Sequence, residues 1–252
     1  MQIALSGERR LLSIENELAI AREIQASILP SDNPQILNLV VAAAYRPMTA
    51  VAGDFYDFIF VDPRKTGILL TDVTGHGVPA ALIAAMIKVA LQSLQHCACE
   101  PAELLRNLNH ILCPQLRAQL VSAAYLFLDT EKYLARYAAA GHPPLIHCRD
   151  GILQRLDKNG LLLGVLPDVE YPVCDLAIES GDRFVLYTDG VIETENAQGH
   201  SFGDNRFDQV VQANRVRPPA ELVSQLLAEL RQWQPRAAHQ HDDITLIVID
   251  VL

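Results

Sequence analysis

The chain has 252 residues, of which 50% are hydrophobic and 20% charged, so its composition is that of a globular protein and not of a disordered or fibrous one. The 30 Asp and Glu residues outnumber the 20 Lys and Arg residues, and the resulting net charge of −10 would repel nucleic acid and anionic membranes. The five cysteines show no paired C-x-x-C spacing, which is typical of free thiols in a reducing compartment. No apolar run is long enough to span a membrane, and the first residues lack the pattern of a signal peptide. We therefore expect a cytoplasmic protein that binds neither nucleic acid nor membrane.

Residues 8–29 contain neither Gly nor Pro and predict a helix that ends at Pro30. Alternating spacings of three and four, as in a coiled-coil seam, relate the following residues: Leu11, Ile14, Leu18, Ala21, Gln25 and Ile28. Two interpretations stay open. The stripe packs on the same chain, or it forms a short coiled coil that dimerises or links to an upstream domain, with Gln25 fixing the register. We assign residues 1–30 to this linker or dimerisation helix and residues 31–252 to a separate domain.

From residue 39 onward, short runs rich in Val, Ile, Tyr and Phe predict strands. These runs are 39–45, 55–61, 67–72, 121–129, 132–140, 183–188 and 244–251. Turn sequences such as D-T-E-K and R-D-G are too short for a crossover helix, so the strands should pair largely antiparallel. Helices are expected at 78–95, 101–116 and 218–233. Because strands and helices are clustered and do not alternate, the predicted fold class is α+β, in layers.

Acidic residues gather where predicted strands meet turns. The four acidic segments are AGDFYD (52–57), TDVTGHG (71–77), YTDG (187–190) and HDDIT (241–245). A single D-G is usually a plain turn. Four such segments beside strands can converge on one point, however, and their mutual repulsion then has to be offset by a positive charge. Asp oxygens together with water suit hard cations, so the pattern predicts a Mg²⁺ or Mn²⁺ site.

In this order, the segments resemble the PPM (PP2C-like) protein phosphatases, and specifically the bacterial serine phosphatases of the SpoIIE/RsbU type. The resemblance rests on six motifs, IQASILP (24–30), AGDFYD (52–57), DVTGHGVPAAL (72–82), AGHPPL (140–145), YTDGVIE (187–193) and HDDITLIV (241–248). It implies an α-β-β-α sandwich of two antiparallel sheets flanked by helices. It also implies hydrolysis of phosphoserine or phosphothreonine on proteins, with two Mn²⁺ or Mg²⁺ ions that activate a water.

The resemblance further implies the oxygen donors of the two ions, which are Asp54, Asp72, the Val73 carbonyl, Asp189, and Asp242 or Asp243. Asp72 would bridge the ions, and the four aspartates Asp54, Asp72, Asp189 and Asp242 would carry catalysis. Asp242 is favoured over Asp243 because related phosphatases bind metal through the first acidic residue of this pair.

Other residues near the motifs are given different roles. Asp57 lies three residues after Asp54, a spacing that puts it on the opposite face of a strand. His142 is interpreted as structural, and His76 either contacts the substrate or only packs its turn. The pattern also has departures, because Ala52 stands where the family usually has Gly. No arginine here matches the one that holds the phosphate in eukaryotic relatives, so phosphate recognition is left open.

Three alternatives use the same residues differently. The H-x-H of His239 and His241 could serve a zinc hydrolase, but the Asp-rich turns would then go unexplained. AGDFYD is similar to the GGDEF loop of nucleotide cyclases, yet it lacks the glycine pair and the acidic position. A catalytically inactive module would bind a phosphoprotein without turnover, although such modules commonly lose metal ligands and this chain keeps four aspartates.

The resemblance also implies partners. The expected substrate is a phosphorylated STAS-type anti-anti-sigma protein in a partner-switching circuit that regulates a sigma factor. An upstream sensor or receiver domain is expected to act through residues 8–29, and a homodimer is expected to form through the same residues. The chain would then be the output half of a larger switch.

Overall fold

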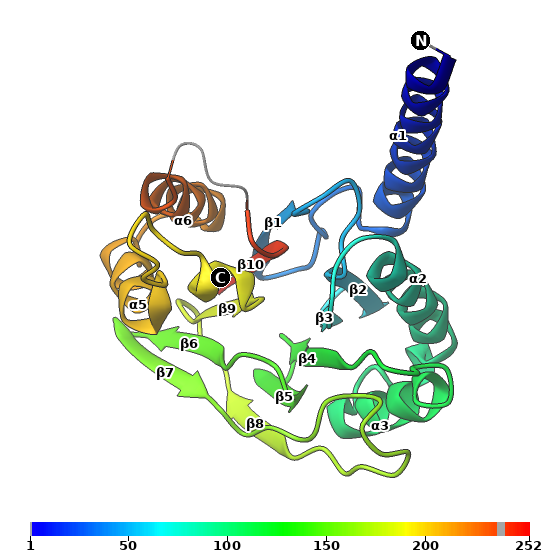
Figure 1. The fold of residues 1–252 in the computed structure, drawn as a ribbon. Coiled ribbons are helices and arrows are strands. Elements are labelled where there is room, and N and C mark those ends of the chain that lie inside the picture. The colour runs from blue at the N-terminus through cyan, green and yellow to red at the C-terminus, as the bar shows by residue number, and fades with distance from the viewer. Residues whose placement is uncertain (1, 236–239) are drawn as a thin grey trace.

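The structure is a computed structural model that describes residues 2–235 and 240–252 (Figure 1). Two antiparallel sheets pack face to face, with helices on both outer faces. One sheet has the strand order β1-β10-β9-β6-β7 and the other has the order β2-β3-β4-β5-β8. The predicted α+β sandwich of antiparallel sheets is therefore confirmed.

The strands of the described chain are β1 (Leu39–Arg46), β2 (Phe55–Asp62), β3 (Lys65–Val73), β4 (Val121–Asp129), β5 (Leu134–Ala140), β6 (Leu145–Arg149), β7 (Ile152–Leu156), β8 (Val173–Ala177), β9 (Arg183–Tyr187) and β10 (Ile244–Val251). The helices are α1 (Gln2–Ile28), α2 (Val78–Ser93), α3 (Pro101–Leu112), α4 (Gly190–Glu193), α5 (Gly203–Ala213) and α6 (Pro219–Trp233), with a 3₁₀ turn at Gln95–Cys97. Each predicted strand and helix is present within a few residues of its expected bounds. The structure adds β6, β7, β8, α4 and α5, of which only the β6–β7 hairpin was implied by the sequence, through its R-D-G turn.

Alternation of side chains along the strands builds the core in layers. In β3, Leu69 faces α2 and α3, whereas its neighbours Ile68 and Leu70 face the other sheet. On the opposite side of the molecule, α6 buries Leu222 and Leu226 against the first sheet. Both sheets are therefore buried on both faces, which explains why their strands are nearly continuous apolar runs.

The inner face of the sandwich changes from apolar to polar at one end. Four rows of alternate residues make this change, namely Leu70 to Asp72, Ala124 to Ser122, Leu186 to Thr188 and Ile247 to Thr245. The apolar member of each row belongs to the core between the sheets. The core therefore ends in a layer of carboxyl and hydroxyl groups, and this end of the sandwich carries the site.

The turn between β6 and β7 follows the R-D-G prediction. Asp150 and Gly151 both have positive φ angles, 51° and 77°, which is the conformation of a two-residue type I′ hairpin turn. This turn matches the twist of the two strands that it joins, so the tight antiparallel connection expected from the sequence is confirmed.

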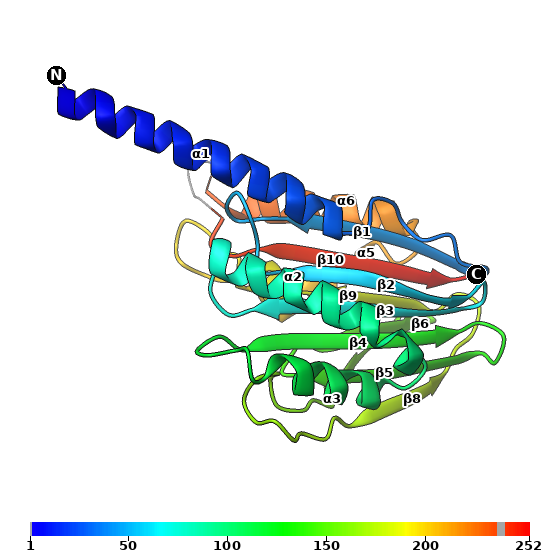
Figure 2. The ribbon, with the colours of Figure 1, turned by 90° about the vertical axis from the view of Figure 1, so that its right-hand side faces the viewer.

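Helix α1 extends away from the body of the molecule (Figure 2). Its C-terminal part packs on the same chain, where Ala21, Gln25 and Ile28 line an apolar cleft together with Leu82 of α2. Ile14, nearer the N-terminus, is 45% exposed. The predicted seam is thus divided, because its last turns pack on the body while Ile14 faces solvent. None of the described helices is both long and apolar enough to cross a membrane.

Candidate metal centre

The four acidic segments meet at the polar end of the sandwich. Asp54 directly precedes β2, Asp72 lies near the end of β3, Asp189 follows β9, and Asp242 lies shortly before β10. Their charges are close enough to act on one another. Burial raises the pKa of Asp72 to about 7, and the charges of Asp189 and Asp242 add to that rise. Folding thus brings together aspartates that the sequence places in separate turns.

Asp54 is the most deeply buried of these carboxylates, with 1% of its surface exposed. Its Oδ2 accepts hydrogen bonds from the hydroxyls of Thr188 at 2.9 Å and Thr245 at 2.5 Å. Its Oδ1 is buried and has no hydrogen-bond partner among the described residues. Burial, with the charge of Asp72 second, raises the pKa of Asp54 well above its ordinary value. The two hydroxyls hold the carboxylate in place. A bound cation or a proton would stabilise its unpartnered oxygen.

Asp189 and Asp242 face the same region. Burial raises the pKa of Asp189, and the charge of Glu193 adds to that rise. Asp189 Oδ1 is buried without a hydrogen-bond partner in the part of the chain that the structure describes. Burial also raises the pKa of Asp242, with Asp189 contributing, while the N–H of Asp243 donates to Asp242 Oδ1 at 2.7 Å. Each carboxylate in this group therefore makes ionisation of its neighbours less favourable.

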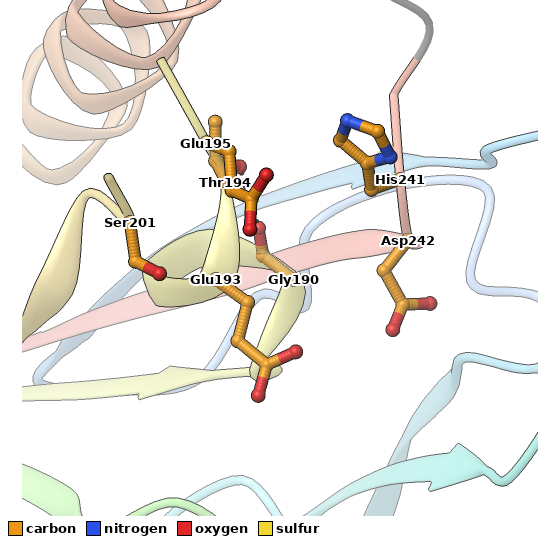
Figure 3. Close-up of a pocket in the computed structure, with 7 residues that line it drawn as sticks. All are labelled: Gly190, Glu193, Thr194, Glu195, Ser201, His241 and Asp242. Carbon is orange, nitrogen blue, oxygen red and sulfur yellow. Dashed lines mark hydrogen bonds between the residues drawn. The ribbon is translucent and has the colours of Figure 1, made fainter. Parts of the chain in front are cut away.

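A cavity of about 350 Å³ opens beside these carboxylates (Figure 3). It is lined by Gly190, Glu193, Thr194, Glu195, Ser201, His241 and Asp242. The carboxylates of Glu193 and Asp242 point to the same side of this space. Glu193 is not among the site residues predicted from the sequence. Its spacing of four from Asp189, across the short helix α4, was the signal that could have placed the two side by side.

Asp243 has a different role from its neighbour Asp242. It is 3% exposed, and both of its carboxylate oxygens accept main-chain hydrogen bonds, Oδ1 from Met48 at 2.6 Å and Oδ2 from Gly53 at 2.7 Å. Asp243 thereby holds the loop that carries Asp54. With those oxygens engaged, Asp242 is the member of the pair that is available to a ligand, which supports the choice made from the sequence.

The donor set fits hard cations that keep part of their water shell. Among the described residues, no three His, Cys, Asp or Glu side chains form a closed cage for an ion. Mg²⁺ and Mn²⁺ do not need one, because they are commonly held by one or two carboxylates with water completing the octahedron. The unpartnered oxygens of Asp54 and Asp189 and the crowding at Asp72 are the observations that favour such ions here.

The remaining sequence candidates lie outside this group or at its edge. Asp57 Oδ2 accepts a hydrogen bond from Lys88 of α2 at 2.7 Å, so it points away from the site, as predicted. His241 is exposed at the rim of the cavity, and its ring belongs to no closed ligand group among the described residues. His239 lies outside the described residues. The structure thus gives the zinc alternative no assembled ligand set in the part that it describes.

Two glycines let the acidic segments approach this closely. A Cβ at Gly53 would lie 2.8 Å from the carbonyl oxygen of Val73, so the Asp54 loop rests directly on the end of β3. A Cβ at Gly190 would overlap the carbonyl oxygen of Asp243. Glycine is therefore required in both the AGD and the TDG motifs because a backbone passes where a side chain would stand.

We expect Gly190→Ala to damage both stability and metal binding. The added methyl group must push β9 and β10 apart at the site, at a cost of about 3 kcal/mol, which lowers the Tm by about 8 °C. Gly199→Ala is the control, because it has open space but a positive φ of 75°, and should cost about 1 kcal/mol through backbone strain alone. Thermal melts with and without Mn²⁺ measure both effects. Equal losses in the two variants would contradict the close approach.

Gln25 of α1 contacts the site loop directly. Its side-chain amide donates to the carbonyl of Ala52 at 2.8 Å and accepts from the N–H of Ala52 at 2.9 Å. Gln25 is 8% exposed, and Ala52 stands two residues before Asp54. The heptad-like spacing predicts that Gln25 fixes the register of a coiled coil. In the structure it instead joins α1 to the loop that carries a predicted metal ligand.

Comparison with known proteins agrees with this architecture. The family of Stage II sporulation protein E (SpoIIE) matches residues 62–252. The phosphoserine phosphatase RsbU of Bacillus subtilis is 31% identical over 94% of this chain and 70% of its own length. The SiaA-PP2C domain of Pseudomonas aeruginosa superimposes with a TM-score of 0.86 at 24% identity, covering 96% of this chain and 98% of that domain. The catalytic domain of the phosphatase PstP, in complex with two manganese ions, has a TM-score of 0.63 at 17% identity and covers 85% and 98% of the two chains.

The sandwich with its acidic end is thus the fold of PP2C-type serine/threonine protein phosphatases. The chain belongs to the SpoIIE family. The resemblance seen in the sequence is confirmed, and with it the assignment to the protein phosphatases as an enzyme class.

Proposed function

We propose that the chain hydrolyses phosphoserine or phosphothreonine on a protein, with two Mn²⁺ or Mg²⁺ ions held at the polar end of the sandwich. The observation that carries this proposal is the pair of buried, unpartnered carboxylate oxygens of Asp54 and Asp189, both of which are close enough to Asp72 for the charges to interact. Buried carboxylates in this state are costly unless a cation neutralises them. When bound, the two ions would lower the pKa of a water and offset the charge of the phosphoryl oxygens.

Each residue has a definite part in this proposal. Asp72, whose pKa responds to the largest number of surrounding carboxylates, is the proposed bridge. Asp54, fixed by two threonine hydroxyls, and the Val73 carbonyl are assigned to one side of the centre. Asp189 and Asp242 complete the set on the cavity side, where the phosphorylated side chain would enter. Asp243 supports the site by accepting main-chain hydrogen bonds and is not assigned as a ligand.

Hydrolysis of an aryl phosphate tests the metal requirement. We expect turnover with Mn²⁺ or Mg²⁺, complete loss in EDTA, and recovery when either ion is added back. Activity that survives chelation, or that only Zn²⁺ supports, would favour the histidine-based alternative. Tight binding of a phosphoprotein without release of phosphate would favour the inactive module.

The substrate that we propose is a phosphorylated STAS-type anti-anti-sigma protein. The support is the similarity to RsbU, a named phosphoserine phosphatase. Candidate STAS proteins from the same organism, phosphorylated on serine or threonine, should lose the mass of one phosphoryl group when incubated with the metal-loaded enzyme. If none of them does, while the aryl phosphate is still hydrolysed, the substrate assignment fails and the chemistry stands.

We also propose that the N-terminal part of α1 dimerises and couples the enzyme to an upstream sensor or receiver domain. The division of the chain at residue 30 and a cytoplasmic location remain predictions of the same kind. The support is that α1 extends away from the body with Ile14 exposed, while Gln25 contacts the site loop (Figure 2).

We expect Ile14→Glu to give a monomer whose Tm is unchanged, because the charge is placed in the seam but outside the packed body. Ile20→Glu is the control on the same helix, since Ile20 is 57% exposed and lies off the seam. Light scattering measures the oligomeric state, and aryl phosphate hydrolysis measures the coupling to activity. A monomeric wild-type protein, or dissociation by Ile20→Glu alone, would contradict the seam.

A further inference from the structure

His142 lies at the metal-centre end of the sandwich and is not explained by the proposed reaction. It follows β5 and is 3% exposed. Its imidazole Nδ1 lies 2.8 Å from the hydroxyl oxygen of Ser122. Burial lowers the pKa of His142 to about 3, so the ring is neutral at any pH at which the enzyme would work. A general acid or base needs a pKa nearer neutrality, so this ring has another role.

Ser122 connects the imidazole to the site. In the antiparallel pairing of β3 and β4, Ser122 stands directly opposite Asp72. Directly paired residues have side chains on the same face, with Cβ atoms about 5 Å apart. Both side chains continue rows that face the inside of the sandwich. The hydrogen bond of His142 therefore ends on the immediate neighbour of the proposed bridging carboxylate.

The second ring nitrogen points to the other sheet. Nε2 is buried and makes no hydrogen bond among the described residues, although the main chain of Tyr187 in β9 is close enough to act on the pKa of the ring in the raising direction. A neutral imidazole carries one N–H. If the hydrogen is on Nε2, the N–H is directed toward the carbonyl of Tyr187, and Nδ1 can accept a hydrogen bond from the Ser122 hydroxyl. The opposite tautomer would set the Nε2 lone pair against that carbonyl, so the Nε2–H form is favoured.

The backbone of His142 is held in place. Asn159 donates from Nδ2 to the carbonyl of His142 at 2.7 Å and accepts from its N–H at 3.3 Å. The preceding residue, Gly141, donates to the carbonyl of Gly160 at 3.0 Å. The ring therefore extends from a fixed point at the end of β5. A shift of β9, in the other sheet, would change the surroundings of Nε2.

We propose that His142 is a positioning residue of the metal centre. Its imidazole accepts the Ser122 hydroxyl at Nδ1 and places Nε2 toward the main chain of Tyr187, so the ring stands between the ends of the two sheets. Through this bridging position, called the tie below, it fixes the spacing between Asp72 and Asp189, which stand beside its two ends. The inference rests on the proposed function, because it takes these two aspartates as ligands.

The decisive measurement is Mn²⁺ affinity, by titration calorimetry of the full chain, together with Tm in EDTA. We expect His142→Ala to weaken Mn²⁺ binding by about 30-fold, as is usual when a group that orients a metal ligand is removed. His142→Asn places an amide near the Nδ1 position, where it can still contact Ser122, but it cannot reach Tyr187, so it should restore Mn²⁺ affinity only in part, to about 10-fold below wild type. His147→Ala is the matched control, because His147 is also buried but contacts Asp182, at the end of β9 remote from Asp189.

The control should lower the Tm while leaving Mn²⁺ affinity within about 2-fold. If His142→Ala lowers only the Tm and not the affinity, His142 is a packing residue and the proposal is wrong. Should that variant not fold, Ser122→Ala removes a single hydroxyl and should still weaken binding by about 3-fold, whereas unchanged affinity would overturn the tie.

An imidazole ¹⁵N spectrum gives an independent readout. We expect the Nε2–H tautomer without titration between about pH 5 and pH 8, and the Nδ1–H form would overturn the arrangement. A wild-type protein that binds Mn²⁺ but releases no phosphate would contradict the proposed function and leave this test intact. A wild-type protein that binds no Mn²⁺ would overturn both.

Discussion

Replacing Asp72 or Asp189 by asparagine should reduce kcat for an aryl phosphate at least about 1,000-fold and leave the protein folded. Each change removes a charge that the proposed ions require. In the absence of metal, the same changes should stabilise the fold, because Asp72 is ionised only against its burial and the charges of Asp189 and Asp242.

The pH dependence of stability follows from the sign of the Asp72 shift. Its pKa is about 7 in the folded protein, against an ordinary value of 3.8. The folded state therefore holds a proton that the unfolded state has lost, and metal-free protein should lose stability as pH rises from about 4 through 7. Asp72→Asn should flatten this slope and raise the Tm in EDTA by about 5 °C at pH 8.

Melting in EDTA across that pH range, followed by activity with Mn²⁺, measures both effects. Asp57→Asn is the matched control, since Asp57 is paired with Lys88 away from the site and should keep kcat within about 3-fold. Near-normal activity of Asp189→Asn would show that the site has been assigned to the wrong residues.

Asp242→Asn and Asp243→Asn should have different effects, the first on Mn²⁺ affinity and the second on stability. At Asp243, an amide can accept only one of the two main-chain hydrogen bonds and turns a donor toward the other N–H. We expect a loss of about 3 kcal/mol and a Tm about 8 °C lower with or without metal. At Asp242, whose pKa is raised mainly by burial, we expect unchanged stability in EDTA and Mn²⁺ affinity at least about 100-fold weaker.

Calorimetric titration with Mn²⁺ and melts in EDTA separate the two phenotypes. The reverse outcome, with Asp243→Asn stable and unable to bind Mn²⁺, would make Asp243 the ligand. Loss of stability in both variants to the same extent would mean that neither carboxylate is reserved for an ion.

The architecture could be predicted because its strands are buried on both faces and read as continuous apolar runs. Among the elements that were not predicted, β8 and α5 lack such an apolar run. The strand β8, Val173–Ala177, is half exposed at a sheet edge and contains Asp175, so its sequence carries little apolar signal. The helix α5, Gly203–Ala213, buries only Phe207 and Val211, and most of its remaining residues are polar.

At the site, the aspartates could be predicted because carboxylates at strand ends beside turns are unusual in themselves. Their supporting contacts could not. Thr188, directly after β9, and Thr245 in β10 have no distinguishing signal in the sequence until the pairing of β9 with β10 sets both hydroxyls on Asp54. The different roles of Asp242 and Asp243 also depend on the path of the 47–53 loop, whose main chain binds Asp243. That tertiary contact leaves no signal in the local sequence.

Because Gln25 contacts Ala52, the rotation of α1 about its own axis affects the loop that carries Asp54. A helix advances about 100° per residue, so only a narrow range of rotations about its axis brings this one carboxamide to both polar atoms of Ala52. A rotation of α1 about its axis, applied at its N-terminal end, would break the two hydrogen bonds at its C-terminal end. Bending of the N-terminal part, by contrast, would leave them intact. The loop before Asp54 is therefore sensitive to rotation of α1 about its axis and insensitive to bending of its N-terminal part.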